Sequence, residues 1–192
     1  MVAFSKESVM QNLMMNPYAI KNKQQYYRFL TSGFIHGNHF HLLVNMFSFY
    51  FFGTAMENVF YYLFGNKGSY YFVALYLLAI IVSDLPTYFK QKNNAAYNSL
   101  GASGGVAAMI FAFIIFMPLQ RICLYIALCI PGFIFGVAYI AYSYYQGRKS
   151  QDHINHDAHL YGSLFGLLFC IIVNPACIPN FIAQIGGWIS SF

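Results

Sequence analysis

The feature that most constrains this chain is a series of apolar runs, each about as long as a membrane-spanning helix. A helix needs about 20 mostly apolar residues to cross a hydrocarbon layer of about 30 Å. Hydrophobic residues make up 59% of the 192 residues and charged residues only 8%, whereas soluble domains carry about 25% charged residues. The composition therefore excludes a soluble globule and predicts an all-α, polytopic membrane helical bundle.

The runs predict five transmembrane helices within a single membrane domain, residues 1–192. We expect spans at residues 41–64, 69–87, 102–117, 122–142 and 158–174. The flanking parts are an aromatic, interfacial segment at 1–40 and a C-terminal tail at 175–192, and the helical core is 41–174. Short turns join the first pair of spans and the third to the fourth, so each of these pairs should form a helical hairpin.

The cysteines and the basic residues are both typical of a membrane protein. Three cysteines lie within apolar runs and the fourth just after one: Cys123, Cys129, Cys170 and Cys177. We interpret them as small hydrophobic residues in helices rather than as a disulfide framework. The net charge of +5 does not indicate nucleic-acid binding, because the basic residues stand at the ends of the runs.

Topology brings the candidate chemical groups to one side of the bundle. The first, third and fifth spans run in the same direction, so their N-terminal ends open on one face. His41 and Asn45 begin the first of these spans, Ser103 begins the next, and His159 begins the last. We therefore expect these four side chains at a similar depth in the membrane.

Ser103 and His159 have the properties of a nucleophile and its general base. A serine hydroxyl is weakly nucleophilic until a neighbouring base accepts its proton. Small residues beside the two positions would let the helices approach closely; they are Gly101, Gly104, Gly162 and Gly166. Taken separately, Ser103 is better explained as a helix N-cap and His159 as an interfacial histidine, and only the combined pattern favours catalysis.

Acyl transfer also requires donors for an oxyanion. Ser103, at a helix N-terminus, would offer its own backbone N–H and the positive end of the helix dipole. His41 and Asn45 share one helix face at i, i+4, and the Asn45 amide can donate; alternatively, the pair only ties helices together. Asp157 lies on a different face from His159, which favours a dyad over a triad.

Taken together, these motifs resemble those of the rhomboid intramembrane serine proteases. The resemblance covers most of the chain, from about Asn16 onward, and lies in the order and spacing of these motifs. The matching motifs are Tyr27-Arg28, His36, His41-x-x-x-Asn45, Gly53-x-x-x-Glu57, Gly101-Ala102-Ser103-Gly104 and Ala158-His159-x-x-Gly162-x-x-x-Gly166.

The resemblance implies a serine endopeptidase that hydrolyses peptide bonds in or near transmembrane segments. It implies a six-helix core, of which five helices are visible, a Ser103–His159 dyad, and an oxyanion site from the Ser103 backbone, His41 and Asn45. Expected partners are transmembrane protein substrates and the lipid bilayer; no cofactor, metal or nucleic acid is expected. The expected location is a bacterial inner membrane. The family often has Tyr four residues after the serine, but here that residue is Ala107, so another group must steady His159.

The distribution of charge and the family resemblance predict opposite membrane orientations. The loops on the dyad face hold most of the basic residues: Lys6, Lys21, Lys23, Arg28, Lys90, Lys92, Arg148 and Lys149. The other face has only Lys67 and Arg121. The positive-inside rule would place the dyad toward the cytoplasm, whereas bacterial rhomboids open outward, and we follow the resemblance.

Two other functions fit parts of the sequence. The six histidines form two clusters, one at His36, His39 and His41 and the other at His153, His156 and His159, with Asp152 and Asp157 beside the second. Imidazole and carboxylate suit zinc, so a membrane metal transporter or metalloprotease is one alternative, although no His-Glu-x-x-His motif is present. The other is an inactive rhomboid-like protein that binds membrane clients.

Overall fold

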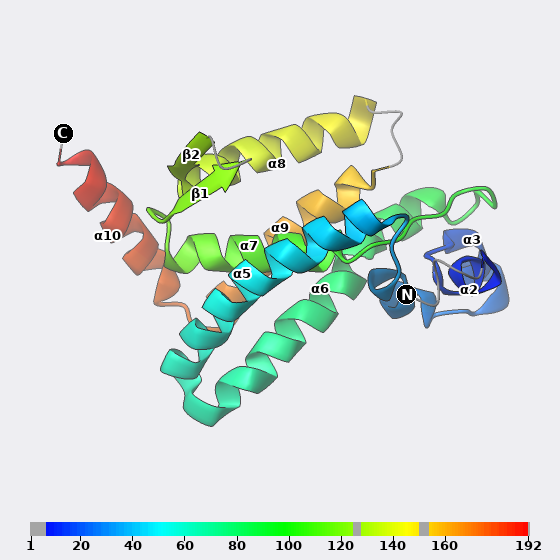
Figure 1. Cartoon of the computed structure of the whole chain (residues 1–192), viewed down its shortest axis with the longest axis horizontal. Coiled ribbons are helices and arrows are strands. Elements are labelled where there is room, and N and C mark those ends of the chain that lie inside the picture. Colours follow the sequence, from blue (N-terminus) through cyan, green and yellow to red (C-terminus); the bar gives the residue numbers. More distant parts are fainter. Residues whose placement is uncertain (1–6, 125–127, 150–153, 192) are drawn as a thin grey trace.

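The structure, a computed structural model, describes residues 7–124, 128–149 and 154–191. These residues form a helical bundle with one small β-hairpin, as Figure 1 shows. In chain order the elements are α2 (Glu7–Leu13), α3 (Pro17–Lys23), α4 (Arg28–Thr31), η1 (Ser32–Phe34), α5 (His39–Phe64), η2 (Gly65–Lys67), α6 (Gly68–Gln91), α7 (Ser103–Phe116), β1 (Arg121–Leu124), β2 (Leu128–Pro131), α8 (Gly132–Lys149), α9 (His156–Val173) and α10 (Cys177–Ile189).

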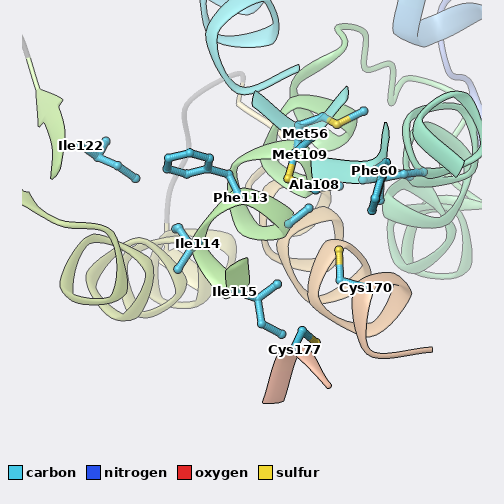
Figure 2. Packing of buried hydrophobic residues seen from close by; sticks show 13 residues of the cluster. Met56, Phe60, Ala108, Met109, Phe113, Ile114, Ile115, Ile122, Cys170 and Cys177 are labelled. Carbon is cyan, nitrogen blue, oxygen red and sulfur yellow. The ribbon is translucent and has the colours of Figure 1, made fainter. Parts of the chain in front are cut away.

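Helix α7 is the centre of the bundle. Its residues are apolar on every side, as expected of a helix buried all round, and it packs most extensively against α9, then against α6 and α5. Figure 2 shows Met109, Phe113 and Ile115 pointing from α7 toward different neighbours. Phe60 of α5 and Cys170 of α9 complete this buried cluster. The first residue of this central helix is Ser103.

Helices α5 and α6 form the expected hairpin. They are joined at η2, where Gly65 has a positive φ of 58°, and the rings of Phe49 and Tyr76 pack with centroids 4.5 Å apart. Helix α6 continues through Pro86 to Gln91, four residues beyond the predicted end. Side-chain contacts hold this extension, because Thr87 and Lys90 are bonded to the N-terminal part of α9.

The prediction of a helix over residues 122–142 was wrong in its first half. Strands β1 and β2 form an antiparallel hairpin, and a disulfide joins Cys123 to Cys129. The interpretation of these two cysteines as helical hydrophobic residues was therefore also wrong, whereas Cys170 and Cys177 are buried free thiols. Pro131 gives a physical reason: a proline disfavours helical backbone in the residue before it, so the helix starts after it, at Gly132.

The N-terminal segment is fixed to the bundle by a buried arginine. Arg28 is 6% exposed, and its Nη1 donates to the carbonyls of Gln11 at 2.9 Å and Met14 at 2.8 Å. A short backbone pairing between Met15 and Ser99 joins the segment to the loop before α7. Arg28 therefore anchors the N-terminal segment through backbone carbonyls.

Two stretches of the described residues are long and apolar enough to cross a membrane. One, His39–Gln91, contains α5 and α6 and has a mean hydropathy of 1.8; the other, His156–Val173, is α9, with 1.4. Helix α7 is apolar but has only 14 residues. The structure thus supports a helical membrane bundle, while the expected number of five spans stays a prediction.

Candidate functional site

Helices α7 and α9 are in direct backbone contact at two positions. A Cβ added at Gly162 would overlap the carbonyl oxygen of Gly104, and one added at Gly166 would overlap that of Ala108. Both contacts exist only because α9 carries hydrogen instead of a side chain at these two positions. The predicted packing role of these glycines thus corresponds to the tightest approach between the two helices.

Gly104 and Gly101 are confined in different ways. A Cβ at Gly104 would overlap the Oγ of Ser83 on α6, so three helices meet at this residue. Gly101 has a φ of 116°, which side-chain-bearing residues rarely adopt, and its N–H donates to Ser32 at 2.9 Å. The backbone immediately before the serine is therefore fixed by its conformation and by a hydrogen bond.

Ser103 occupies the first helical position of α7. The N-cap residue is Ala102, which makes no capping bond, so the serine does not cap the helix. Its side chain is partly exposed, and its N–H belongs to the first turn, where amide groups lack partners within the helix. The hydroxyl makes no hydrogen bond to any residue that the structure describes.

His159 lies one turn into α9, three residues before Gly162. Its imidazole stacks on the ring of Tyr139 from α8, with centroids 6.2 Å apart and planes inclined by 24°. The His156 ring meets it edge-on at 5.9 Å. The structure therefore brings the helix ends that carry Ser103 and His159 together, but no hydrogen bond joins the two side chains. Hydrogen bonds in catalytic sites are often long in the free enzyme and shorten with substrate.

His41 and Asn45 lie on the same side of the bundle as the serine. A Cβ at Gly101 would be 2.6 Å from His41 Cε1, so the imidazole lies against the backbone two residues before Ser103. Asn45 is 4% exposed, and its Nδ2 donates to the His41 carbonyl at 2.9 Å. One amide hydrogen of Asn45 is thus committed to its own helix, and one remains.

The N-terminus of α9 is held by a side-chain network that begins at Asn155. Its Oδ1 caps the helix by accepting from the Ala158 N–H at 3.1 Å and also accepts from Thr87 at 3.0 Å. Its Nδ2 donates to buried Asp84 at 3.3 Å, which in turn accepts from Ser32 at 3.4 Å. This network fixes the helix end that carries His159 against α6 and η1.

A polar cavity of about 170 Å³ lies beside this network. Its lining includes Gln146, Asn155 and His156, together with Lys90 and Asp157, which form a salt bridge of 3.1 Å. Neither Ser103 nor His159 lines this cavity. The cavity therefore lies next to the N-terminal ends of α7 and α9 but is not the space between Ser103 and His159.

His36 is a buried histidine outside the apolar helices. It is 4% exposed and packs edge-on against His41, with ring centroids 5.1 Å apart. Its Nε2 has no hydrogen-bond partner among the described residues. Burial, with a smaller effect from His41, lowers the pKa of His36 from 6.5 to about 4, so it is neutral at physiological pH.

The histidine clusters do not assemble a metal centre in the part of the chain that the structure describes. No three His, Cys, Asp or Glu side chains converge there in a way that could hold an ion. Asp152 and His153, which the metal hypothesis needs, lie outside the described residues. The described members of the second cluster, His156 and His159, instead contact each other and aromatic rings.

Sequence reasoning missed three residues at the site. Tyr139 was part of an apolar run with no polar pattern, and only the tertiary packing of α8 brings it to His159. Asn155 did have a recognisable signal, because Asn directly before a helix is a preferred N-cap. The third is Asp84, whose place near the end of an apolar run gave no sign that it is the buried acceptor of the Asn155 network.

Comparison with known proteins agrees with the motif pattern. The family model for the rhomboid domain matches residues 23–176. The chain belongs to the rhomboid family. This match includes Arg28, both backbone contacts between α7 and α9, and the helices that carry Ser103 and His159.

The rhomboid domain is also similar to curated mammalian proteins. The presenilin-associated rhomboid-like protein, mitochondrial, of Rattus norvegicus is 30% identical over 146 residues, which are 73% of this chain and 36% of the relative. The protein of the same name from Homo sapiens is 29% identical over the same shares. The chain thus spans about a third of these relatives. Their names place them in mitochondria, which does not fit the expected bacterial inner membrane.

Proposed function

We propose that this rhomboid is an intramembrane serine endopeptidase in which Ser103 is the nucleophile and His159 its general base. The observation that carries the proposal is the Gly104–Gly162 backbone contact, which adjoins both residues. A serine and a histidine need a separation within hydrogen-bond reach, and a contact without intervening side chains between their two helices supports that geometry.

The proposed reaction is acyl transfer in two steps. His159 accepts the hydroxyl proton of Ser103 while the Ser103 Oγ attacks the scissile carbonyl. The imidazolium then gives that proton to the leaving amine. Water, activated by the same imidazole, releases the acyl group and regenerates the serine. No carboxylate is required, and packing against neighbouring rings keeps the imidazole in place.

The oxyanion would be stabilised at the N-terminus of α7. The Ser103 N–H and the positive end of the helix dipole face the developing charge, and donors fixed in a site that excludes water are effective there. His41, which lies against Gly101, and the uncommitted amide hydrogen of Asn45 supply further donors. Removing one such donor typically lowers kcat about 10²–10³-fold.

The substrates would be segments of membrane proteins. Because the helices around Ser103 are apolar and suit a bilayer, a peptide reaches the serine from the lipid or from its boundary with water. Water and the scissile bond therefore meet at the polar, N-terminal ends of α7 and α9. The protein is accordingly proposed to act on transmembrane partners in the membrane that contains it.

The test combines active-site labelling with turnover in detergent. A fluorophosphonate probe should label the wild-type protein and Ser191→Ala, a matched control with an exposed serine on the far side of the chain, but not Ser103→Ala. A fluorogenic transmembrane peptide should be cleaved by wild type and by His39→Ala, and not by Ser103→Ala or His159→Ala. A chelator should change neither the rate of labelling nor the rate of peptide cleavage.

Two results would contradict the protease function. Chelator-sensitive cleavage that survives Ser103→Ala would mean metal chemistry. A folded wild-type protein that is neither labelled nor active on a broad panel of transmembrane peptides would leave client binding as the function of this fold.

A further inference from the structure

Three aromatic rings form a cluster beside His159, and one of them, Tyr139, contacts the imidazole. Phe111 of α7 packs against Tyr139 of α8 with ring centroids 5.7 Å apart, and Tyr139 stacks on His159. Phe135, one turn earlier on α8, also stacks on Tyr139, with ring centroids 5.6 Å apart. The tyrosine ring therefore contacts two phenylalanine rings, and it lies nearly parallel to the imidazole, with planes inclined by 24°.

Helix α7 places no aromatic ring of its own against the His159 imidazole. One turn after Ser103 it carries Ala107, a methyl group that is 1% exposed. An imidazole that must accept a proton from one direction and release it in another needs a fixed ring plane. Among the described residues, the ring that lies nearly parallel to His159 is Tyr139, which comes from a different helix.

The reach of Tyr139 depends on how α8 is seated. Gly136, three residues earlier on the same face of α8, is buried against α7: a Cβ there would be 3.4 Å from both Ile114 and Phe111. The opposite side of α8 is open, with Val137 71% exposed. Helix α8 also packs against α9, which carries His159, so Tyr139 reaches the imidazole from a helix that contacts both α7 and α9.

We propose that Tyr139 is the positioning residue for His159, so that the dyad is aligned only while α8 is packed against α7 and α9. This proposal rests on the proposed protease function and deepens it. Removing α8 from its seat, for example when a substrate helix inserts beside it, would withdraw the ring from His159. Return of α8 would restore the imidazole plane, so that α8 position and catalytic competence are coupled.

The first experiment separates positioning from substrate binding. Tyr139→Leu should lower kcat about tenfold, the free-energy equivalent of one aromatic stacking contact, with little change in KM. Tyr139→Phe, which keeps the ring and loses the hydroxyl, should retain wild-type kcat. Tyr145→Ala, an exposed tyrosine on the same helix, is the matched control and should have no effect on either parameter.

The second experiment observes the contact without any need for turnover. In histidine-labelled protein, the ring signals of His159, assigned by their loss in His159→Gln, should be shifted by the Tyr139 ring current. The shift should persist in Tyr139→Phe and disappear in Tyr139→Leu. A nuclear Overhauser effect between the Tyr139 and His159 rings should be seen in the wild-type protein, so the test holds even if the leucine variant fails to fold.

The outcomes distinguish the two proposals. An active wild type in which Tyr139→Leu keeps full kcat, or in which the two rings show no Overhauser effect, overturns the role of Tyr139 alone. A folded wild type without turnover or fluorophosphonate labelling overturns the protease function, whatever the rings show. Loss of kcat and of the ring-current shift in Tyr139→Leu, with both retained in Tyr139→Phe, supports the proposal.

Discussion

Gly162 occupies a position where the backbone of α7 leaves no room for a side chain. We predict that Gly162→Ala forces α9 away from Gly104, with a loss of about 1–3 kcal/mol of stability, as is typical when an atom is added to a packed interface. Activity should fall more than stability, because a displacement of about 1 Å between reacting groups can cost about 10²-fold. Thermal unfolding and kcat/KM in the same detergent measure both.

The control for this substitution is Gly186→Ala on α10, where an added Cβ would meet no atom within 4 Å. It should leave the Tm and kcat/KM unchanged. An unchanged kcat/KM in Gly162→Ala would mean that the α7–α9 contact does not set the distance between Ser103 and His159.

His36 should make the fold sensitive to acid. Its pKa is 6.5 when unperturbed and about 4 in the folded protein, so between these values the unfolded chain binds the proton and the folded chain does not. The contribution to stability is complete above pH 6.5 and is lost as the pH falls toward 4. We expect a loss on the order of 1–3 kcal/mol, measured as the Tm between pH 7.5 and 4.5.

His36→Phe should reduce this dependence, since phenylalanine keeps the ring contact with His41 and cannot be protonated. His39→Phe, at an exposed position, is the comparison and should keep the wild-type slope. A slope unaffected by His36→Phe would assign the acid sensitivity to another group.

At the residue scale, sequence reasoning placed Ser103 and His159 near each other because helix direction alone decides which ends share a face. The glycine spacing also predicted the close contact, since Gly162 and Gly166 lie on one face of a helix. Tyr139 could not be found this way: its role depends on the lateral seating of α8, which no local pattern in an apolar run determines.

At the scale of elements, the hairpin of β1 and β2 is the departure from expectation. Residues 122–130 are nearly all apolar, and such a run cannot be distinguished by periodicity from part of a buried helix. The helical interpretation also argued against a disulfide between Cys123 and Cys129, because residues six apart on a helix point to different faces. Pro131 followed by Gly132 was the available signal that the helix begins later.

The hairpin predicts that two of the four cysteines are protected from alkylation. Under denaturing, non-reducing conditions only Cys170 and Cys177 should react, and reduction should release Cys123 and Cys129. Closing a loop this short contributes about 2 kcal/mol by chain entropy, so a reductant should lower the Tm. Mass spectrometry and thermal unfolding measure these two effects.

Cys123→Ser is the matching variant, and its Tm should not respond to reductant. Alkylation of all four cysteines in the unreduced, denatured protein would contradict the disulfide.

For the whole molecule, the length of α6 predicts that its two ends lie on opposite sides of the membrane. Its 24 residues extend about 36 Å, enough to cross the hydrocarbon layer. In sealed vesicles, a membrane-impermeant maleimide added outside should label only one of Lys67→Cys and Lys92→Cys. The native cysteines do not interfere, because they are buried or joined in the disulfide.

After the vesicles are lysed, the maleimide reaches both membrane faces and should label both variants equally, which serves as the control. Equal labelling of both variants in intact vesicles of a single orientation would mean that α6 does not span.

Helix α7, with 14 residues, is about 21 Å long and so falls short of the full hydrocarbon thickness of about 30 Å. If its C-terminal end reaches one surface, Ser103 at the other end lies roughly 9 Å below the opposite surface. Under the proposed protease function, the scissile bond of a substrate would then lie near the end of the substrate's membrane segment. Inserting one helical turn into α7 would move the cut by about 5 Å along that segment.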